Sequence, residues 1–101
     1  MEQFVFMMEI DTFERFGKTF QYIKMNMDKA PLVIIRGPKG FVMCGYLNIE
    51  AAEKLGDMAV RVTGVTDLES MLGSKVAQVT SRAKNEGISE GQVVGDVIKY
   101  L

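Results

Sequence analysis

The chain has 101 residues, of which 48% are hydrophobic and 25% charged, and its formal net charge is −1. These values are those of an ordinary folded domain and exclude a disordered tail, a fibrous repeat and a disulfide scaffold. The balanced charge argues against a nucleic-acid partner and against a membrane surface, since both attract basic patches. The longest apolar run, Phe41–Leu47, is far shorter than the roughly 20 residues that span a bilayer.

Histidine is absent from the sequence, and cysteine occurs once, as Cys44. The chain therefore lacks Ser-His and Cys-His dyads and His-ligated metals, which argues against an enzyme of the common hydrolase and metalloenzyme types. A single cysteine cannot form an intramolecular disulfide, and the start of the sequence, Met1-Glu2-Gln3, lacks the basic residues of a signal peptide. We therefore expect the protein to be cytoplasmic.

The first 47 residues predict a mostly antiparallel sheet of about four strands. The strands are expected where apolar and β-branched residues gather, at residues 3–9, 18–27, 32–35 and 41–46. The run Leu32–Ile35 is typical of a strand buried on both sides. Gly37-Pro38-Lys39-Gly40 predicts a tight turn, which makes the last two strands antiparallel neighbours. Between the first two strands, Asp11–Gly17 has the spacing of a single helical turn.

From Asn48 onward the hydrophobic period becomes helical. Small and apolar residues recur at intervals of three and four, at Ala51, Leu55, Ala59 and Val62. The acid-before-base pair of Asp57 and Arg61, four residues apart, supports the same helix. The pattern predicts one helix that begins at the N-cap Asn48, crosses Gly56 and ends at Gly64.

Shorter elements are expected in the rest of the chain. Residues 66–73 begin with the spacing of a capping box and predict a short helix. Residues 75–80 fit either a strand or a helix, and we expect a strand, followed by a helix that Thr80 or Ser81 caps. Apolar residues at helical intervals from Val93 predict a final docked helix.

The predicted strands come mostly first and the predicted helices mostly last, which is the α+β class. No linker, low-complexity tract or internal repeat divides the sequence, so we expect a single domain over residues 1–101. Within it, residues 1–47 form a β-rich oligomerisation part and residues 48–101 a mainly helical part.

The strand at residues 18–27 carries apolar side chains on both faces. Phe20 and Tyr22 share one face, and Ile23 and Met25 share the other. A domain of this size has too few helices to cover both faces, so we expect copies of the chain to associate through their N-terminal strands. The alternative is that all these side chains are internal.

Four stretches of the sequence resemble a known family. They read G-P-K-G-F-V-M-C-G-Y-L-N-I, A-A-E-K-L-G-D, V-T-G-V and A-K-N-E-G-I-S-E-G. The chain resembles, from about Lys18 to its end, the YunC-like proteins of archaea and bacteria, whose function is unknown. It departs from their pattern at Gln92 and at Val97-Ile98. The resemblance implies a prokaryotic protein with an N-terminal β-region used for tetramer formation, and it implies no activity, substrate or catalytic residue.

Cys44 is the residue that most nearly indicates chemistry. In a functional interpretation, the N-terminus of the helix at Asn48 favours the thiolate, with help from Lys39 or Arg36, and Cys44 serves as a nucleophile or redox sensor. In a structural interpretation, it is a small buried hydrophobe. The structural interpretation is favoured because no histidine exists to act as a base.

A small ligand is expected to bind near the segment that joins the last predicted strand to the helix. The candidate ligand-binding residues are Gly40, Gly45, Tyr46 and Asn48. The eight methionines fit core or interface packing better than a soft metal ion, and we expect no metal and no cofactor. The sequence favours a homo-oligomeric, non-catalytic assembly or small-ligand-binding module, with a thiol-dependent enzyme or redox sensor using Cys44 as the alternative.

Overall fold

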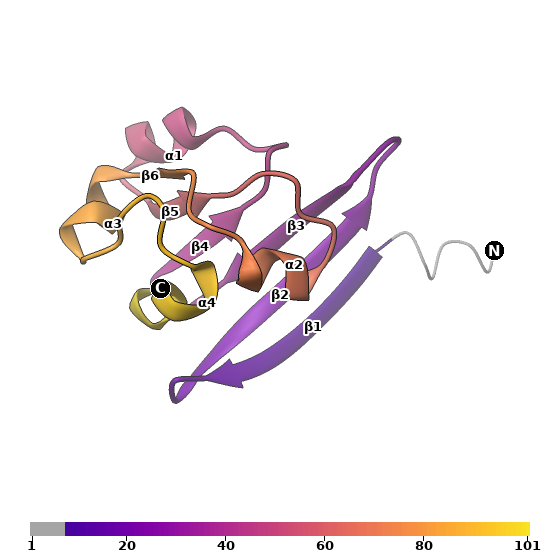
Figure 1. Ribbon diagram of the computed structural model, residues 1–101, viewed down its shortest axis with the longest axis horizontal. Coiled ribbons are helices and arrows are strands. Elements are labelled where there is room, and N and C mark those ends of the chain that lie inside the picture. Colours follow the sequence, from indigo (N-terminus) through magenta and orange to yellow (C-terminus); the bar gives the residue numbers. More distant parts are fainter. Residues whose placement is uncertain (1–7) are drawn as a thin grey trace.

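The computed structural model describes residues 8–101 and shows an α+β fold (Figure 1). In that range a six-stranded sheet, larger than the four strands predicted, consists of Met8–Arg15 (β1), Lys18–Asn26 (β2), Pro31–Arg36 (β3), Gly40–Met43 (β4), Met58–Arg61 (β5) and Gln78–Val79 (β6). The helices are Ile49–Leu55 (α1), Leu68–Gly73 (α2), Ser81–Asn85 (α3) and Val94–Val97 (α4), and a 3-10 turn follows at Ile98–Tyr100. The strands lie in the sheet in chain order. Only β4 and β5 are parallel among these described neighbours.

The first hairpin differs from the prediction. The strand expected at residues 3–9 falls largely outside the described residues, and the helical turn predicted at Asp11–Gly17 is wrong, because β1 continues to Arg15. All eight residues of β1 pair with β2. The chain reverses at Phe16 and Gly17, whose φ angles of 55° and 72° are the left-handed values of a two-residue hairpin turn. Pairing along the whole strand outweighs the weak local capping signal.

The helix predicted from Asn48 to Gly64 is wrong beyond Leu55. Asn48 is the N-cap, as predicted, and its side chain accepts a hydrogen bond from the Glu50 N–H. Gly56 adopts a φ of 81° and ends α1 by donating its N–H to carbonyls of the last turn. The chain then enters β5, so Ala59 is a buried strand residue. Helix α1 is therefore the crossover between two parallel strands.

The later elements agree with the prediction in type. Asp67 is the N-cap of α2, one residue after Thr66, where the predicted capping box begins. Ser70 completes the capping box. The strand expected at residues 75–80 is β6, and Thr80 caps the following α3. Residues 48–101 thus contribute two strands to the sheet in addition to the helices. No helix within residues 8–101 is long and apolar enough to cross a membrane.

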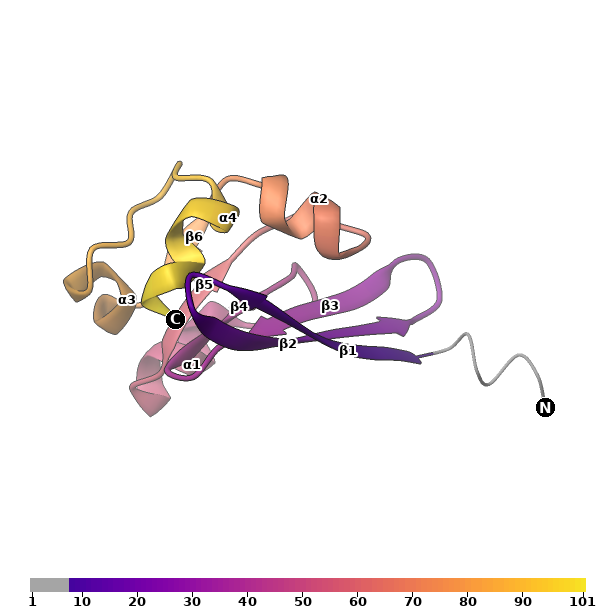
Figure 2. The same cartoon turned by 90° about the horizontal axis from the view of Figure 1, so that it is seen from below.

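The two faces of the sheet are covered to different extents. On one, which we call the core face, alternate side chains pack beneath α2, α4 and Leu101 (Figure 2). The fully buried side chains of this face include Phe20, Val33, Ile35, Val42 and Val60. On the opposite face, α1 lies over the end made by β4 and β5, where Met43, Ala52 and Ala59 form a second cluster.

The part of that opposite face formed by β1, β2 and β3 is here called the open face, because no helix of residues 8–101 covers it (Figure 2). Ile10, Ile23 and Ile34 lie side by side across it, one on each strand. Ile10 is 67% exposed, whereas Ile23 and Ile34 are half-buried. The run Leu32–Ile35 is therefore fully buried on one side only, since Val33 and Ile35 point into the core and Ile34 lies on the open face.

Candidate functional site

Three of the predicted site residues meet at one cavity. Cys44, Gly45 and Tyr46 line a hollow of about 260 Å³ just beyond the end of β4. The other walls come from the start of β3 with the residue before it and from the segment after β5, and they consist of Ala30, Pro31, Gly64 and Val65. The cavity therefore has mainly apolar walls and could accept a small apolar group.

Two hydrogen-bonding side chains hold the walls of this cavity. The Tyr46 hydroxyl donates to the Ala30 carbonyl at 3.2 Å and so ties the segment after β4 to the β2–β3 loop. On the other side, the Arg61 guanidinium donates to the carbonyls of Gly45 and Leu47, both at 3.1 Å, and to the Gln78 amide oxygen at 2.8 Å. The spacing of Asp57 and Arg61 predicts a helical ion pair, and this prediction is wrong. The position of β5 in the sheet shows that Arg61 instead holds the segment after β4 in place.

Cys44 is buried in the core, with 3% of its surface exposed. Its Sγ accepts a hydrogen bond from the Val33 N–H at 3.3 Å, and it packs within the main hydrophobic cluster. Lys39 and Arg36, proposed from the sequence as its helpers, lie at the opposite end of β4. This placement favours the structural interpretation of the thiol, because a reactive cysteine needs access to solvent and a polar neighbourhood.

Gly40 and Asn48, the other two predicted ligand residues, do not line the Cys44 cavity. Gly40 lies at the start of β4, where its N–H donates to the backbone oxygen of Leu101 at 2.9 Å. A Cβ at Gly40 would lie 2.2 Å from the Met58 carbonyl oxygen, so close packing requires glycine there. Gly40 borders a separate hollow of about 200 Å³ that also includes Asp57. The Asn48 side chain is occupied as the helix cap.

Two titratable side chains near α2 have shifted pKa values. Burial raises the pKa of the Tyr22 phenol, and the carboxylates of Glu9 and Asp67 raise it further. Hydrogen bonding to Ser70 lowers the pKa of Asp67, and the charge of Lys24 lowers it further. Both shifts follow from the way α2 is capped and seated on the core face, and neither group lines the Cys44 cavity. Among residues 8–101, no three Cys, Asp or Glu side chains gather as a metal site would require.

The comparisons with known proteins give a family and a close structural relative. A crystal structure of a protein of unknown function, TA1206 from Thermoplasma acidophilum, is 47% identical to this chain and superimposes with a TM-score of 0.92. The match covers 94% of this chain and 93% of that protein. No protein of curated function matches. A family model described as a domain of unknown function (DUF1805) matches residues 43–101, which include the cavity residues that follow β4. The chain belongs to this family, for which no specific activity is indicated.

Proposed function

We propose that the protein is a homo-oligomeric, non-catalytic assembly module whose copies associate through the open face. The observation that carries the proposal is the row of Ile10, Ile23 and Ile34 on a face that no helix of residues 8–101 covers. Exposed apolar surface of this kind marks an interaction site on most proteins. The resemblance to YunC-like proteins, which implies a tetramer built through N-terminal strands, supports the same conclusion. The proposal includes a single domain in the cytosol, where the unpaired Cys44 stays reduced.

The test is the molar mass in solution, measured by light scattering over a range of concentrations. We expect the wild-type chain to be larger than a monomer, and Ile10→Asp to dissociate it because the substitution places a charge within the apolar row of the contact. Leu55→Asp is the matched control, since Leu55 is 78% exposed on α1, away from the open face. A wild-type chain that is monomeric at about 100 μM, a concentration at which weak specific contacts still form, would contradict the proposal.

The Cys44 cavity supports a second candidate function, the binding of a small ligand. Its volume of about 260 Å³ exceeds the roughly 150 Å³ of an apolar cavity that binds benzene. Gly45 and Gly64 bring the backbone to its walls, and Tyr46 supplies an aromatic surface. A ligand bound only by the folded protein raises the melting temperature as its concentration increases. With indole as the probe, we expect such a rise in the wild type and a smaller one in Tyr46→Ala. An equal rise in both proteins would place the probe elsewhere.

The thiol-dependent alternative can be separated from both. We expect iodoacetamide to react with the folded protein at least about 100-fold more slowly than with the protein in denaturant, because Cys44 reacts only through opening of the core. Equal rates in the two conditions would restore the hypothesis of a reactive thiol. Replacement of Cys44 by alanine is expected to leave the oligomeric mass unchanged.

A further inference from the structure

The distribution of side chains along the open face indicates how two copies pair. We infer that two copies stack open face against open face about a two-fold axis that runs parallel to β2 and passes over Ile23. In this arrangement, β1 of one copy lies over β3 of the partner. The inference rests on the proposed function and specifies its geometry.

The open face is organised in rows that run across the strands. Strand pairing and alternation define four rows from the β2–β3 loop toward the β1–β2 turn, namely Met8, Met25 and Leu32; Ile10, Ile23 and Ile34; Thr12, Gln21 and Arg36; and Glu14 and Thr19. The first two rows are entirely apolar, although Leu32 also packs against the main core cluster, and the last two rows are polar. The face therefore changes from apolar to polar along the strand direction.

This gradient selects the direction of the axis. A two-fold axis parallel to the strands places each row over the same row of the partner, so apolar rows meet apolar rows and polar rows meet polar rows. An axis perpendicular to the strands reverses the rows and places Glu14 over the methionine row, which buries a charge without a partner. Moving that axis until only the apolar rows overlap would halve the contact. Ile23 lies on the middle strand and therefore meets the partner's Ile23.

The charged residues agree with this arrangement. Among the described residues of β1, β2 and β3, the charged side chains on the open face are Glu14 and Arg36, which have opposite signs and lie on the two outer strands. Stacking β1 over the partner's β3 brings Glu14 to within one row of the partner's Arg36, and the two-fold axis repeats the pair. Such complementary charges fix the register of an interface.

A hollow in the open face lies where the Glu14 carboxylate would arrive. It measures about 250 Å³ and is bordered by Thr12, Thr19, Gln21, Arg36, Gly37 and Pro38. The Arg36 guanidinium lies 3.5 Å from the Gln21 amide oxygen, at the limit of a hydrogen bond. The hollow thus offers a cation and hydroxyl groups to a carboxylate that enters from the partner.

The free edge of β1 is less suited to pairing than the face. The Thr12 N–H donates to the Asp11 side chain at 2.8 Å, although backbone N–H groups at an open edge would otherwise bond to an added strand. An incoming strand would have to break this bond. Eight residues at 3.4 Å and three strands at 4.8 Å give the open face an extent of about 27 by 14 Å, which is at the small end of protein interfaces, so the dimer should dissociate on dilution.

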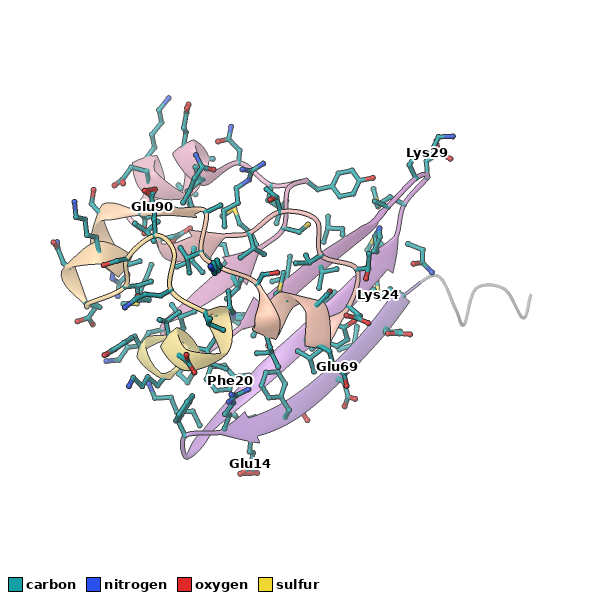
Figure 3. The ribbon with its side chains drawn as sticks, viewed as in Figure 1. Glu14, Phe20, Lys24, Lys29, Glu69 and Glu90 are labelled. Carbon is teal, nitrogen blue, oxygen red and sulfur yellow. The ribbon has the colours of Figure 1, made fainter. Side chains whose placement is uncertain are left out.

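A charge exchange tests the pairing of Glu14 with the partner's Arg36. We expect Glu14→Arg and Arg36→Glu each to raise the dimer dissociation constant about tenfold or more, and the double variant to return it to within about threefold of the wild-type value. Glu90→Arg is the control, because Glu90 lies near α3 and β6, well away from Glu14 beside the β1–β2 turn (Figure 3). A double variant no tighter than the single variants would overturn the inferred geometry.

Cross-linking locates the axis independently. In a Cys44→Ala background, Ile23→Cys should be joined to itself by a short bis-maleimide, since stacked sheets lie about 10 Å apart, too far for a disulfide. Ile10→Cys should link faster when mixed with Ile34→Cys than alone. Faster self-linking of Ile10→Cys would place the axis elsewhere. A monomeric wild type would remove the proposed function itself, whereas a wild-type dimer that fails these two tests would remove only the geometry.

Discussion

The core face and the open face of β1–β3 are made by the same strands, but the chain covers only one of them. Tyr22 and Ile35 on the core face are 6% and 0% exposed, whereas Ile10 on the open face is 67% exposed. The difference shows that apolar residues on both faces of a strand do not determine which of the two faces the chain itself covers. On the core face α2, α4 and Leu101 provide the cover, and on the open face we propose that a second copy does.

The largest difference in stability is expected between a substitution on the core face and one on the open face. Phe20→Ala on the core face should lower the free energy of unfolding by about 3 to 5 kcal/mol, because it leaves a cavity in a closed core. Ile10→Ser on the open face should change the free energy of unfolding of the monomer, measured at high dilution, by less than about 0.5 kcal/mol. Its main effect should be to weaken association between copies. Urea unfolding and light scattering on both variants measure the contrast. Similar losses of stability would mean that both faces are covered within one chain.

A second large effect is expected where Leu101 closes the core face against β4. Gly40→Ala should cost about 3 kcal/mol, because the new methyl would lie 2.2 Å from the Met58 oxygen and force β4 and β5 apart. Gly73→Ala provides the control, since a Cβ there meets nothing within 4 Å. Denaturant unfolding should show the control to be within about 0.5 kcal/mol of the wild type. Equal losses at both glycines would show that the approach of β4 to β5 at Gly40 and Met58 is not tight.

A moderate effect is expected at Thr80, which fastens α3 to the sheet. Its buried hydroxyl donates to the Asp57 carbonyl at 2.8 Å and accepts from the N–H groups of Ala59 and Ala83. Thr80→Val keeps the shape but leaves these groups without a partner, which should cost about 2 kcal/mol. Thr80→Ser keeps the hydroxyl and should lose less than half as much in the same unfolding measurement. If the two variants lose equal stability, packing rather than hydrogen bonding holds α3.

The smallest effect concerns the cap of α2, the helix that lies over β2 and β3. The pKa of Asp67 is lowered in the folded protein from its usual 3.8, so its contribution to stability is complete above pH 3.8 and is lost as the pH falls through the folded-state pKa. Asp67→Ala should therefore be less stable than the wild type at pH 7, and the difference should shrink on acidification. Asp67→Asn should retain a cap without this pH dependence. A difference that stays constant between pH 7 and pH 2 in urea unfolding would contradict the assignment.

Much of the fold could be predicted from local sequence patterns. The errors in that prediction have physical causes. The tight turn at Gly37–Gly40 and the Asn48 cap depend on neighbouring residues, and the prediction is confirmed for both. The helix predicted across Gly56 is wrong because the small apolar residue Ala59 fits a buried parallel strand as well as a helix stripe, and Val62 lies just after that strand. The left-handed conformation of Gly56 decides between them, and periodicity does not reveal it.

The candidate site could be predicted less completely. Cys44, Gly45 and Tyr46 are consecutive in the sequence, so one short motif was enough to predict one side of the cavity. Its other walls, among them Ala30 and Val65, come from distant parts of the chain and depend on the strand order. The spacing of Arg61 from Asp57 predicts a helical ion pair, whereas its actual role follows from β5 lying beside β4.

The order of the strands affects how the protein forms during synthesis. Since neighbours in the chain are neighbours in the sheet, each strand can pair with one that the ribosome has already released. Strands β1–β3 are complete at residue 36, before the helices and Leu101 that cover the core face have been made. A nascent chain therefore exposes two apolar surfaces for a time. If copies associate through the open face as proposed, chains growing on adjacent ribosomes of one messenger would be able to join during that interval, and assembly would begin before translation ends.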